Sequence, residues 1–483
     1  MPTHNRNVLL GGSGSNSGAL IPKFYIDDNG VARLRTEGDL VFNGVVDVAT
    51  NAMKNEYQNT GIESISFPDL ETITGSYAMS YFISGDTNLT TISFPSLETI
   101  TGSYAMEYLC HSDTYLTSID FSSLTSVGSY SMQYAFYGCT RLTGIDFSSI
   151  TSLGTYGLQY AFYGCSGITE ADFSSLTSIP TYGMRNALYN CTSLVDADFS
   201  SVTSIASYGM YEAFRNCSNL ESIDFSSLTS IGSYGAQNGF YGCSSLETIE
   251  FPELTTLYEA ALKESFKGCS SLESVSFPKL TDVRSITNPG NNGGLWGTFG
   301  EISSLKSISL PSLVTISYRD ALDSMCYNCT GLETIDMRSL KTINSVDGMY
   351  LAFHGCTSLE SVVFPELETL SGAYAFSNIF EGCTNLVSVS FPKLKAITGD
   401  WAMSASFASC TKLTTISFPA LTSIYYNAFG NNSESAGYKK GIFLNCSALT
   451  EVHFPAAMQS SVTTMANYSA KWGASNATIY FDL

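Results

Sequence analysis

Hydrophobic residues recur along the chain in a short pattern that returns every 26 or 27 positions. Each copy starts at an apolar anchor and reads L-x-x-I-x-F-[PS]-x-L-x-x-I, as in "LTSIDFSSLTSV" from Leu116. Apolar residues at the anchor, +3 and +5, with polar residues at +2 and +4, are typical of a strand with one face inward. Proline or serine at +6 ends it, because proline cannot donate a hydrogen bond to a sheet. We therefore expect one short strand per copy.

The anchors define an array of fifteen copies. Two spacings exceed the usual interval, 305 − 272 = 33 and 449 − 413 = 36, and predict insertions near residues 284–301 and 425–442. The anchors are Ile62, Leu89, Leu116, Leu142, Ile168, Leu194, Leu220, Leu246, Leu272, Leu305, Leu332, Leu359, Leu386, Leu413 and Leu449.

A second segment, polar and aromatic, returns the chain to the next anchor, as in "SYSMQYAF" from Ser129. Its pattern leaves open a strand or a short helical turn. One copy buries apolar groups worth roughly 10–15 kcal/mol, whereas ordering its residues costs roughly 1.5 kcal/mol each. A single copy cannot fold alone, so we predict a repeat solenoid in which stacked coils cover one another.

The ends of the chain depart from the period and predict caps. We expect a flexible Gly/Ser-rich leader over 1–18, an N-terminal cap over 19–60, the solenoid over 61–455 and a C-terminal cap over 456–483. In the first cap, "KFYIDDNGVARLR" has the Asn-Gly signal of a β-hairpin and "VVDVATNAMKNEYQ" a helical pattern. In the second, "PAAMQSSVTTMANYSAKWG" predicts a helix and "ATIYFDL" a closing strand.

Cysteine has a fixed place in the repeat. We predict that it packs in the core as a free thiol, because parallel Cβ atoms about 4.8 Å apart are too distant for the usual ~3.8 Å of a disulfide. The preceding residue is mostly glycine or asparagine and predicts a left-handed turn. Cys110 and Cys326 stand at −6, where other copies carry phenylalanine. The eleven cysteines at −3 are Cys139, Cys165, Cys191, Cys217, Cys243, Cys269, Cys329, Cys356, Cys383, Cys410 and Cys446.

Sequences such as "AFYGCTRLTGIDF" and "AFHGCTSLESVVFPELETL" resemble the BspA-like leucine-rich repeats of bacterial and protist surface proteins. The likeness covers about residues 61–455, with a period about three residues longer than usual. It implies a leucine-rich-repeat β-solenoid of about 15 coils and a non-catalytic role in recognition or adhesion. Similar repeats occur in proteins of phages of gut bacteria. A host-contacting phage particle protein and a surface adhesin of a gut-type bacterium are therefore both open.

Charge and composition narrow the partners. Acidic residues number 43 against 22 basic ones, a net charge of −21 that repels phosphate backbones and anionic lipids. We expect a protein or glycan ligand, with no nucleic acid and no membrane insertion. We find no signal peptide, membrane span or wall anchor in the sequence. Localisation stays open, and release with a virion by lysis is favoured slightly over the cytoplasm or the cell surface.

Evidence for catalysis is thin. The histidines His4, His111, His354 and His453 lie in different copies or in the leader, and the sequence contains no P-loop or HExxH motif. We expect neither an enzyme nor a cofactor. A structural spacer and a metal-dependent enzyme are the alternatives from other classes.

Two side-chain stripes and the insertions are the candidate binding residues. The acidic stripe faces outward at +4, beside Glu170 and Asp196 at +2, and suits a cationic partner or Ca²⁺; drift among duplicated copies is the alternative. Tyrosines recur at +14 and −5, where they can bind a ligand or pack on each other. In the insertions, Trp296, Tyr438, Lys439 and Lys440 suit a binding loop or a tolerated surface insertion. The stripe members are Asp120, Asp146, Asp172, Asp198, Asp224 and Glu250 (acidic), Tyr130, Tyr156, Tyr182, Tyr208 and Tyr234 (+14), and Tyr137, Tyr163, Tyr189 and Tyr241 (−5).

Overall fold

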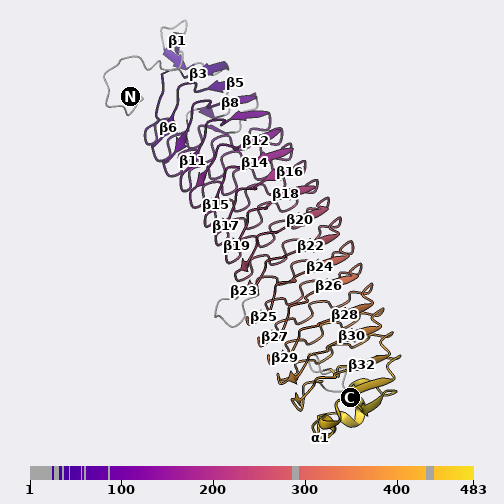
Figure 1. The fold of residues 1–483 in the computed structure, drawn as a ribbon. Helices are drawn as coiled ribbons and strands as arrows, with labels where there is room; N and C mark the ends of the chain where they lie inside the picture. The colour runs from indigo at the N-terminus through magenta and orange to yellow at the C-terminus, as the bar shows by residue number, and fades with distance from the viewer. Residues whose placement is uncertain are drawn as a thin grey trace, which may run out of the picture. The chain divides into compact units, whose positions relative to one another are not determined.

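The computed structural model describes residues 24–26, 32–34, 37–42, 44–55, 57–58, 61–84, 88–284, 293–430 and 440–483. The chain forms two compact units, Met1–Phe225 and Ser226–Leu483. Both are built from the coils of a parallel β-solenoid of about 15 turns, as predicted. The strand arrows of each unit follow one another in coil order (Figure 1).

The predicted strand after each anchor is present. In the first unit, β3 (Glu37–Val41), β5 (Gly61–Ser66), β8 (Thr91–Ser93) and β10 (Ser118–Asp120) form one parallel sheet. A second parallel sheet contains β12 (Gly144–Asp146), β14 (Glu170–Asp172), β16 (Asp196–Asp198) and β18 (Ser222–Asp224). The register pairs equivalent residues of neighbouring coils, so each repeat position becomes a row across the sheet.

Shorter strands follow the turn at +6 and make a second side of each coil. They end on the apolar residue at +11, which is why the sequence pattern returns to an isoleucine, leucine or valine there. In the first unit they are β6 (Thr72–Ile73), β9 (Thr99–Ile100), β11 (Ser126–Val127), β13 (Ser152–Leu153), β15 (Ser178–Ile179) and β17 (Ser204–Ile205).

The second unit repeats this plan. The longer strands are β20 (Thr248–Glu250), β22 (Ser274–Ser276), β24 (Ser307–Ser309) and β26 (Thr334–Asp336), followed by β28 (Ser361–Val363), β30 (Ser388–Ser390), β32 (Thr415–Ser417), β34 (Glu451–Phe454) and β35 (Thr478–Phe481). The shorter ones are β19 (Ser230–Ile231), β21 (Thr256–Leu257), β23 (Asp282–Val283), β25 (Thr315–Ile316), β27 (Thr342–Ile343), β29 (Thr369–Leu370), β31 (Ala396–Ile397) and β33 (Ser423–Ile424).

The third side of each coil is neither the strand nor the helical turn that the sequence left open. It is a chain of hydrogen-bonded turns, which we call the turn ribbon. Its N–H groups alternate between two acceptors: Met132 donates to Gly157 O of the next coil (3.0 Å), and Gln133 donates to Tyr130 O three residues back (3.4 Å). Every fourth residue is left-handed, as at Tyr130 (φ 61°), Tyr134 (φ 58°) and Gly138 (φ 75°).

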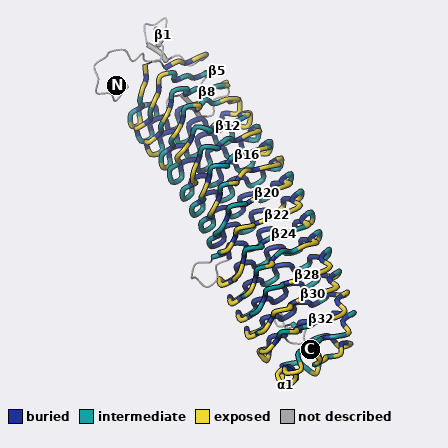
Figure 2. The backbone as a smooth tube through the Cα atoms, viewed as in Figure 1, coloured by how far each residue is buried: buried dark blue, intermediate teal, exposed yellow. Residues whose placement is uncertain are grey.

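The apolar positions of the repeat fill the space between the three sides. Anchor leucines such as Leu116 and Leu142 are completely buried. The phenylalanines at +5 stack from coil to coil, for example Phe67 on Phe94 (5.2 Å between ring centroids). Buried and exposed residues alternate around each coil (Figure 2), which confirms the inward and outward assignment of the pattern.

The cysteines lie in this core as predicted. All thirteen are buried thiols that form no disulfide. The residue before each −3 cysteine is left-handed, with φ between 56° at Asn328 and 85° at Gly268. The thiol also has a role that the sequence did not predict: it approaches a carbonyl of the preceding coil, as from Cys139 Sγ to Cys110 O (3.0 Å) and from Cys165 Sγ to Phe136 O (3.0 Å).

The N-terminal cap is partly as expected. Strands β1 (Phe24–Ile26) and β2 (Ala32–Leu34) pair antiparallel, as a hairpin requires. The predicted helix over 45–58 is wrong. Val45–Asn55 forms a further coil, in which Asn51 and Met53 donate N–H groups to Ser76 O and Ala78 O of the following coil, and β4 (Tyr57–Gln58) pairs with β7 (Ile83–Ser84). The left-handed Asn51 and Asn55 stop helix formation. The leader, 1–18, lies outside the described residues.

The C-terminal cap contains less helix than expected. The segment over 455–473 holds η2 (Ala456–Met458), the short α1 (Gln459–Thr463) and η3 (Tyr468–Gly473). Left-handed Asn467, Lys471 and Trp472 interrupt a continuous helix. The closing strand is confirmed as β35, which pairs in parallel with β34. Trp472 is fully buried against Phe429, so the last turn of the chain completes the core.

Candidate binding faces

The structure brings four of the six predicted acidic residues together. Asp146, Asp172, Asp198 and Asp224 are direct register partners on β12, β14, β16 and β18. With Glu170 and Asp196 they line an open groove of about 640 Å³. Asp120 lies on β10, in the other sheet of this unit, and Glu250 lies on β20 of the second unit beside Ser276.

A local hydrogen bond explains why aspartate occupies +4. Oδ1 of Asp146 accepts the N–H of Ser148 (3.1 Å), and Asp172 and Asp198 accept those of Ser174 (2.9 Å) and Ser200 (2.8 Å). Asp120 does the same for Ser122 (3.1 Å). In each case the carboxylate closes the turn at the end of the strand, which is a common use of aspartate.

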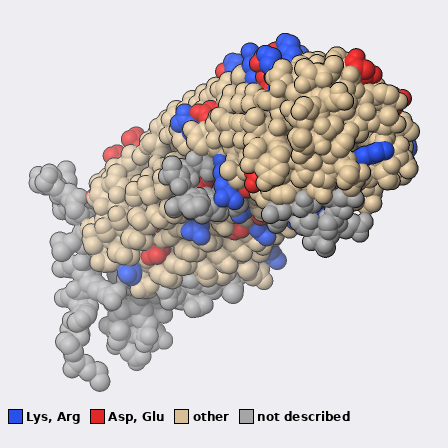
Figure 3. Space-filling model, turned by 90° about the horizontal axis from the view of Figure 1, so that it is seen from below, with Lys and Arg blue, Asp and Glu red and all other residues tan. Residues whose placement is uncertain are grey.

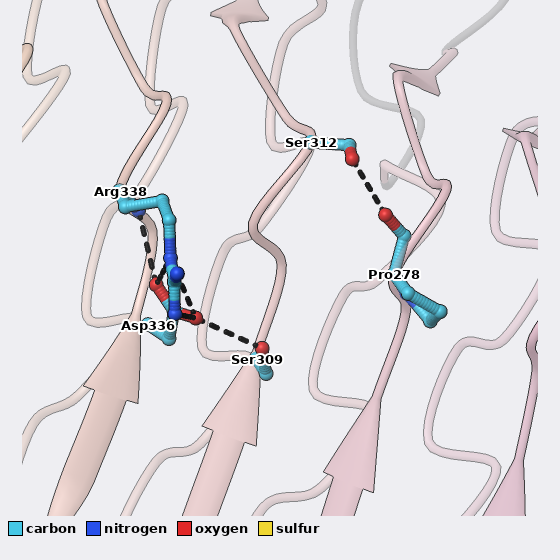
Figure 4. A network of polar contacts seen from close by, with 5 residues as sticks. All are labelled: Pro278, Ser309, Ser312, Asp336 and Arg338. Atoms are coloured by element: carbon cyan, nitrogen blue, oxygen red, sulfur yellow. Dashed lines mark hydrogen bonds and ion pairs between the residues drawn. The ribbon is translucent and has the colours of Figure 1, made fainter.

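The second unit contains one further example. Asp336 accepts the N–H of Arg338 (3.3 Å), and the Arg338 guanidinium binds the same carboxylate at 2.6 Å (Figure 4). On the neighbouring coil, position +6 is Pro311, which has no N–H, and position +4 is Ser309. The Ser309 hydroxyl donates to Asp336 Oδ2 (3.3 Å).

The sequence contains a signal for this rule that sequence reasoning missed. Aspartate stands at +4 only in copies whose +6 residue has an N–H, and copies with proline at +6 carry serine, glutamate, valine or histidine at +4. The copies with aspartate have Ser122, Ser148, Ser174, Ser200, Ser226 or Arg338 at +6. Both the cationic-partner and the duplication hypotheses overlooked this turn-closing role.

The groove shows no converging metal site. Within the described ranges, no group of three or more histidine, cysteine, aspartate or glutamate side chains is placed to hold a metal ion. Glu170 and Asp196, at +2, have no turn to close. They are the acidic residues of the groove whose presence the backbone does not explain.

The predicted tyrosine stripes are real columns of stacked rings in the first unit. At +14, Tyr130 stacks on Tyr156 (4.7 Å), Tyr156 on Tyr182 (4.5 Å) and Tyr182 on Tyr208 (4.9 Å). At −5, Tyr137 stacks on Tyr163 (4.8 Å) and Tyr163 on Tyr189 (4.6 Å). His111 extends this second column by stacking on Tyr137 (5.1 Å). Tyr234 and Tyr241 belong to the second unit.

A third column lies on the same turn ribbon and was missed. Tyr81, Tyr108, Tyr134 and Tyr160 stack in order at 4.6 to 4.8 Å, and Tyr160 also contacts Tyr163 of the neighbouring column at 5.9 Å. These rings sit eight residues before an anchor, a regularity visible in the sequence. We call the three columns together the tyrosine face. Its members are Tyr77, Tyr104, Tyr130, Tyr156, Tyr182, Tyr208, Tyr81, Tyr108, Tyr134, Tyr160, Tyr137, Tyr163 and Tyr189.

Two of these columns hold tyrosine in an unfavourable backbone conformation. Tyr130, Tyr156 and Tyr160 have φ of 61°, 59° and 55°. A bulky residue is rare at such angles, whereas glycine and asparagine adopt them readily. Asn186 and Asn238 occupy the equivalent place in later coils with φ of 53° and 51°. The turn therefore does not need tyrosine, and the ring must supply the advantage.

The candidate catalytic groups are in structural roles. Burial raises the pKa of the Cys383 and Cys446 thiols to about 12, so they are not nucleophilic thiolates near neutral pH. Cys326 and Cys329 form the sequence's C-x-x-C, and Cys329 Sγ lies 2.9 Å from Phe299 O, as in the other cysteines that approach a carbonyl of the preceding coil. His354 stacks on Tyr327 (4.7 Å), and burial lowers its pKa.

Two of the four candidate binding residues in the insertions, Trp296 and Lys440, lie among the described residues. Trp296 lies half-buried beside Lys263, whose Nζ is 4.5 Å from the ring centroid. Lys440 binds Glu381 Oε1 (2.7 Å). Tyr438 and Lys439 lie outside the described residues.

On the surface shown in Figure 3, charged side chains are sparse among uncharged ones, in line with the composition. Among the described residues, no helix has the length and apolar character needed to cross a bilayer.

Solved structures with the same kind of fold share little sequence with this chain. A leucine-rich repeat protein from Bacteroides ovatus is 18% identical, with 87% of this chain and 92% of that chain covered and a TM-score of 0.46. A leucine-rich cell surface protein from Faecalibacterium prausnitzii is 16% identical, with 94% and 98% covered and a TM-score of 0.29. No curated protein matches the sequence. These similarities carry no argument about a ligand.

A family model gives the stronger result. The BspA-type leucine-rich repeat region matches six times, at residues 50–186, 132–263, 184–290, 212–379, 323–437 and 377–471. Together the matches extend over most of the chain, including residues 50–55 of the first coil, which the sequence had assigned to a helix. Proteins with such repeats are typically non-catalytic and bind proteins or mediate adhesion. The chain belongs to the family of BspA-type leucine-rich repeat proteins.

Proposed function

We propose that this protein is a non-catalytic recognition protein that binds a protein or glycan on a cell surface through its tyrosine face. The observation that carries the proposal is the set of three ring columns on one ribbon, two of which hold tyrosine at backbone angles that it rarely adopts. Stacking contributes about 0.5–1.5 kcal/mol per aromatic pair. Strained backbone costs about 1–3 kcal/mol per residue. Stacking alone does not favour tyrosine over asparagine, so a role in binding supplies a reason for the rings.

Tyrosine suits such a surface physically. Its ring is large, rigid and amphipathic, so contact area is gained with little loss of side-chain entropy. The rings of the tyrosine face are half-buried, with neighbours holding each ring in place. A protein surface or the apolar face of a sugar would both fit. The net charge of −21 argues against nucleic acid and anionic membranes as partners.

The acidic groove is a second candidate contact. Glu170 and Asp196 extend from β14 and β16 beside the aspartate row and would meet a cationic segment of the partner. We propose no cofactor for this contact. Ca²⁺ is the alternative occupant, and calorimetry with CaCl₂ alone would detect it.

Two kinds of protein with this function stay open. A phage particle protein that contacts the host and an adhesin of a gut-type bacterium use the same chemistry, and the neighbouring genes distinguish them. A structural spacer would have the fold without a ligand. A metal-dependent enzyme, the remaining alternative, would need a site other than the groove.

The test is binding of labelled protein to a glycan array and to intact gut bacteria. Tyr160→Ser with Tyr163→Ser removes the last ring of one column and the middle ring of the adjacent one, and the turn tolerates Tyr160→Ser because Ser324 holds the equivalent place in the second unit (φ 53°). We expect at least tenfold weaker binding. Tyr425→Ser with Tyr426→Ser is the matched control, since these tyrosines are 42% and 57% exposed in the second unit. Equal binding by both variants and the parent would refute the tyrosine face.

A further inference from the structure

A ring column in the second unit is interrupted by two glycines. Tyr327 and His354, both at −5, stack at 4.7 Å with an angle of 11° between their planes. One coil earlier the −5 residue is Gly300, and the −8 residue, which carries a tyrosine in the tyrosine face, is Gly297. The coil between Lys267 and Tyr327 therefore presents no side chain at either position.

Packing does not require glycine at these two places. A Cβ on Gly300 would lie 3.5 Å from Gly297 O and 3.7 Å from Tyr327 O, which are ordinary contacts. A Cβ on Gly297 would lie 3.5 Å from Glu264 Cγ. Gly297 is left-handed (φ 57°), but Glu264 and Ser324 hold the same conformation in the adjacent coils (φ 49° and 53°). The missing side chains leave space that the fold could have filled.

The space is an open recess of about 200 Å³ with fixed walls. Trp296 forms one wall, with Lys263 Nζ 4.5 Å from its ring centroid and a hydrogen bond to the Asp323 carboxylate. Lys267 Nζ lies 3.2 Å from Glu301 Oε2 at the rim. The lining comprises Glu264, Lys267, Trp296, Glu301, Ser324 and Tyr327, over the two glycines.

The recess matches one ring of the column. Neighbouring coils are about 4.8 Å apart, so the side chains flanking the empty position are about 9.6 Å apart. A planar ring at the midpoint would lie about 4.8 Å from each neighbour, close to the 4.7 Å at which Tyr327 stacks on His354. It would stack on Tyr327 on one side and face the Lys267 ammonium on the other.

We propose that this recess binds one aromatic side chain, phenylalanine or tyrosine, presented by a protein partner. The partner's ring completes the column between Lys267 and Tyr327, packs its edge on Trp296, and offers a tyrosine hydroxyl to the carboxylates at the rim. The site belongs to the second unit and uses no residue of the tyrosine face. It therefore stands or falls independently of the function proposed above.

The probes are N-acetyl-tyrosinamide and N-acetyl-phenylalaninamide, with N-acetyl-leucinamide and methyl glucoside as comparisons, titrated into the full chain by saturation-transfer NMR. We expect the aromatic amides to bind with a Kd on the order of 1 mM, as suits so small a ligand. The leucine amide and the glucoside are expected to bind at least tenfold more weakly. Equal binding of the leucine amide, or binding of the glucoside alone, overturns the proposal.

Gly300→Tyr supplies the missing ring from within the chain. We expect it to fold with an unchanged or higher Tm and to weaken the aromatic amides at least tenfold, whereas Gly300→Ala weakens them less than threefold. Tyr327→Leu, which keeps the recess and removes the stacking partner, is the second variant if Gly300→Tyr does not fold. Undiminished binding by Gly300→Tyr, or by Tyr327→Leu, overturns the proposal. Loss of amide binding with cell binding intact separates this site from the tyrosine face.

Discussion

The two units are built from the same coil but carry different side chains on its surface. In the first unit, the turn ribbon carries stacked tyrosines, and the strands of its groove end in aspartate followed by serine. In the second, proline replaces most of those serines, and lysine pairs with glutamate one coil away, as in Lys279 with Glu253 (2.6 Å) and Lys395 with Glu368 (2.8 Å).

The difference teaches which positions the fold controls. The N–H at +6 is absent where proline stands, as in most coils of the second unit, and is accepted by aspartate in coils of the first unit's groove, so one backbone requirement is satisfied in two ways. The lysine and glutamate pairs are at least a third exposed, so solvent screens them and they contribute little to stability. In two of the three tyrosine columns, by contrast, the backbone conformation is unfavourable for the residue that occupies it. Function is therefore best sought in the first unit's ribbon, with the Gly300 recess as the exception in the second.

The largest expected effect comes from a deletion that shifts the repeat by half a coil, and deletion of a whole coil is its control. Removal of 143–168, where 168 − 142 = 26, joins Leu142 to Thr169 in register and is expected to leave a folded protein. Removal of 387–413, where 413 − 386 = 27, is the matched deletion in the second unit. Deletion of 143–155 shifts the register by half a coil and is expected to abolish the cooperative transition in circular dichroism. Equal damage from whole and half coils contradicts stacked repeats.

The second prediction concerns the pH dependence of stability, which we expect to differ between the turn ribbons of the two units. Asp320 and Asp347 stand where the first unit has Tyr130 and Tyr156. Burial, followed by the charges of Asp320 and Asp347, raises the pKa of Asp323 to about 7, although hydrogen bonds from Ser324 and Trp296 lower it. Because this pKa exceeds that of the unfolded chain, the folded state binds more protons between about pH 4 and 7. The contribution of this group to the stability of the second unit is therefore fully present below about pH 4 and is lost as the pH rises from about 4 to 7.

Asp323→Asn removes the ionisation and keeps an acceptor oxygen for the Ser324 hydroxyl. We expect the variant to gain about 2 kcal/mol at pH 8 and almost nothing at pH 4. Amide hydrogen exchange resolved by segment is the measurement, because it reports each unit separately. Arg319, which pairs with Asp320 and Asp347, stays in place. An equal gain at both pH values would show that burial of the ionised carboxylate is not the cause.

The third prediction exchanges one unit's turn for the other's. Asp172→Ala leaves the Ser174 N–H without its acceptor and is expected to cost about 1 kcal/mol. Asp172→Asn keeps an acceptor and is expected to be nearly neutral. Asp172→Ser with Ser174→Pro copies the second unit and is expected to restore stability to within about 0.5 kcal/mol. Urea denaturation provides the values. A double variant as unstable as Asp172→Ala would break the equivalence of the two turns.

The smallest effect is expected from charge alone. Asp172 and Asp198 are register partners, and like charges about 4.8 Å apart repel by roughly 1 kcal/mol in water. Asp172→Asn with Asp198→Asn keeps both turns and is expected to raise Tm by one to two degrees in low salt and not in 0.5 M NaCl. If the groove meets a cationic partner, binding weakens too. Binding that is unchanged at every ionic strength leaves turn closure as the full explanation of the row.

The repeat made most of the fold predictable, because a position whose character is unclear in one copy can be identified from the same position in the other copies. The strands, the buried thiols and the left-handed residue before each cysteine follow from positions that recur. The turn ribbon did not follow, since hydrogen bonds that alternate between Tyr130 O and Gly157 O produce neither a period of 2 nor one of 3.6. For the same reason Val45–Asn55 resembled a helix.

The candidate sites were predicted less completely. The two recognised tyrosine stripes are true columns, but the column through Tyr134 needed alignment at −8 rather than +14. The role of Asp172 depended on comparing +4 with +6 within each copy. The recess at Gly300 is defined by two missing side chains, and only the structure shows that, among the residues it describes, no other side chain fills their place.

The hydrogen bonds of the turn ribbon also give the coil a direction. Tyr134 and Phe136 both donate forward, to Gln159 O and Ala161 O of the next coil, and Leu158 and Tyr160 repeat this with Gly183 O and Arg185 O. Along the turn ribbon, each of these coils therefore offers donors to its successor and acceptors to its predecessor, whereas N–H groups on the other sides donate backward, as from Thr125 to Glu98 O. A gene for such a chain can lengthen by whole-coil duplication without chemical mismatch at the joint. On the turn ribbon, this polarity sets different tasks for the two caps, since the N-terminal one must satisfy carbonyl groups and the C-terminal one N–H groups.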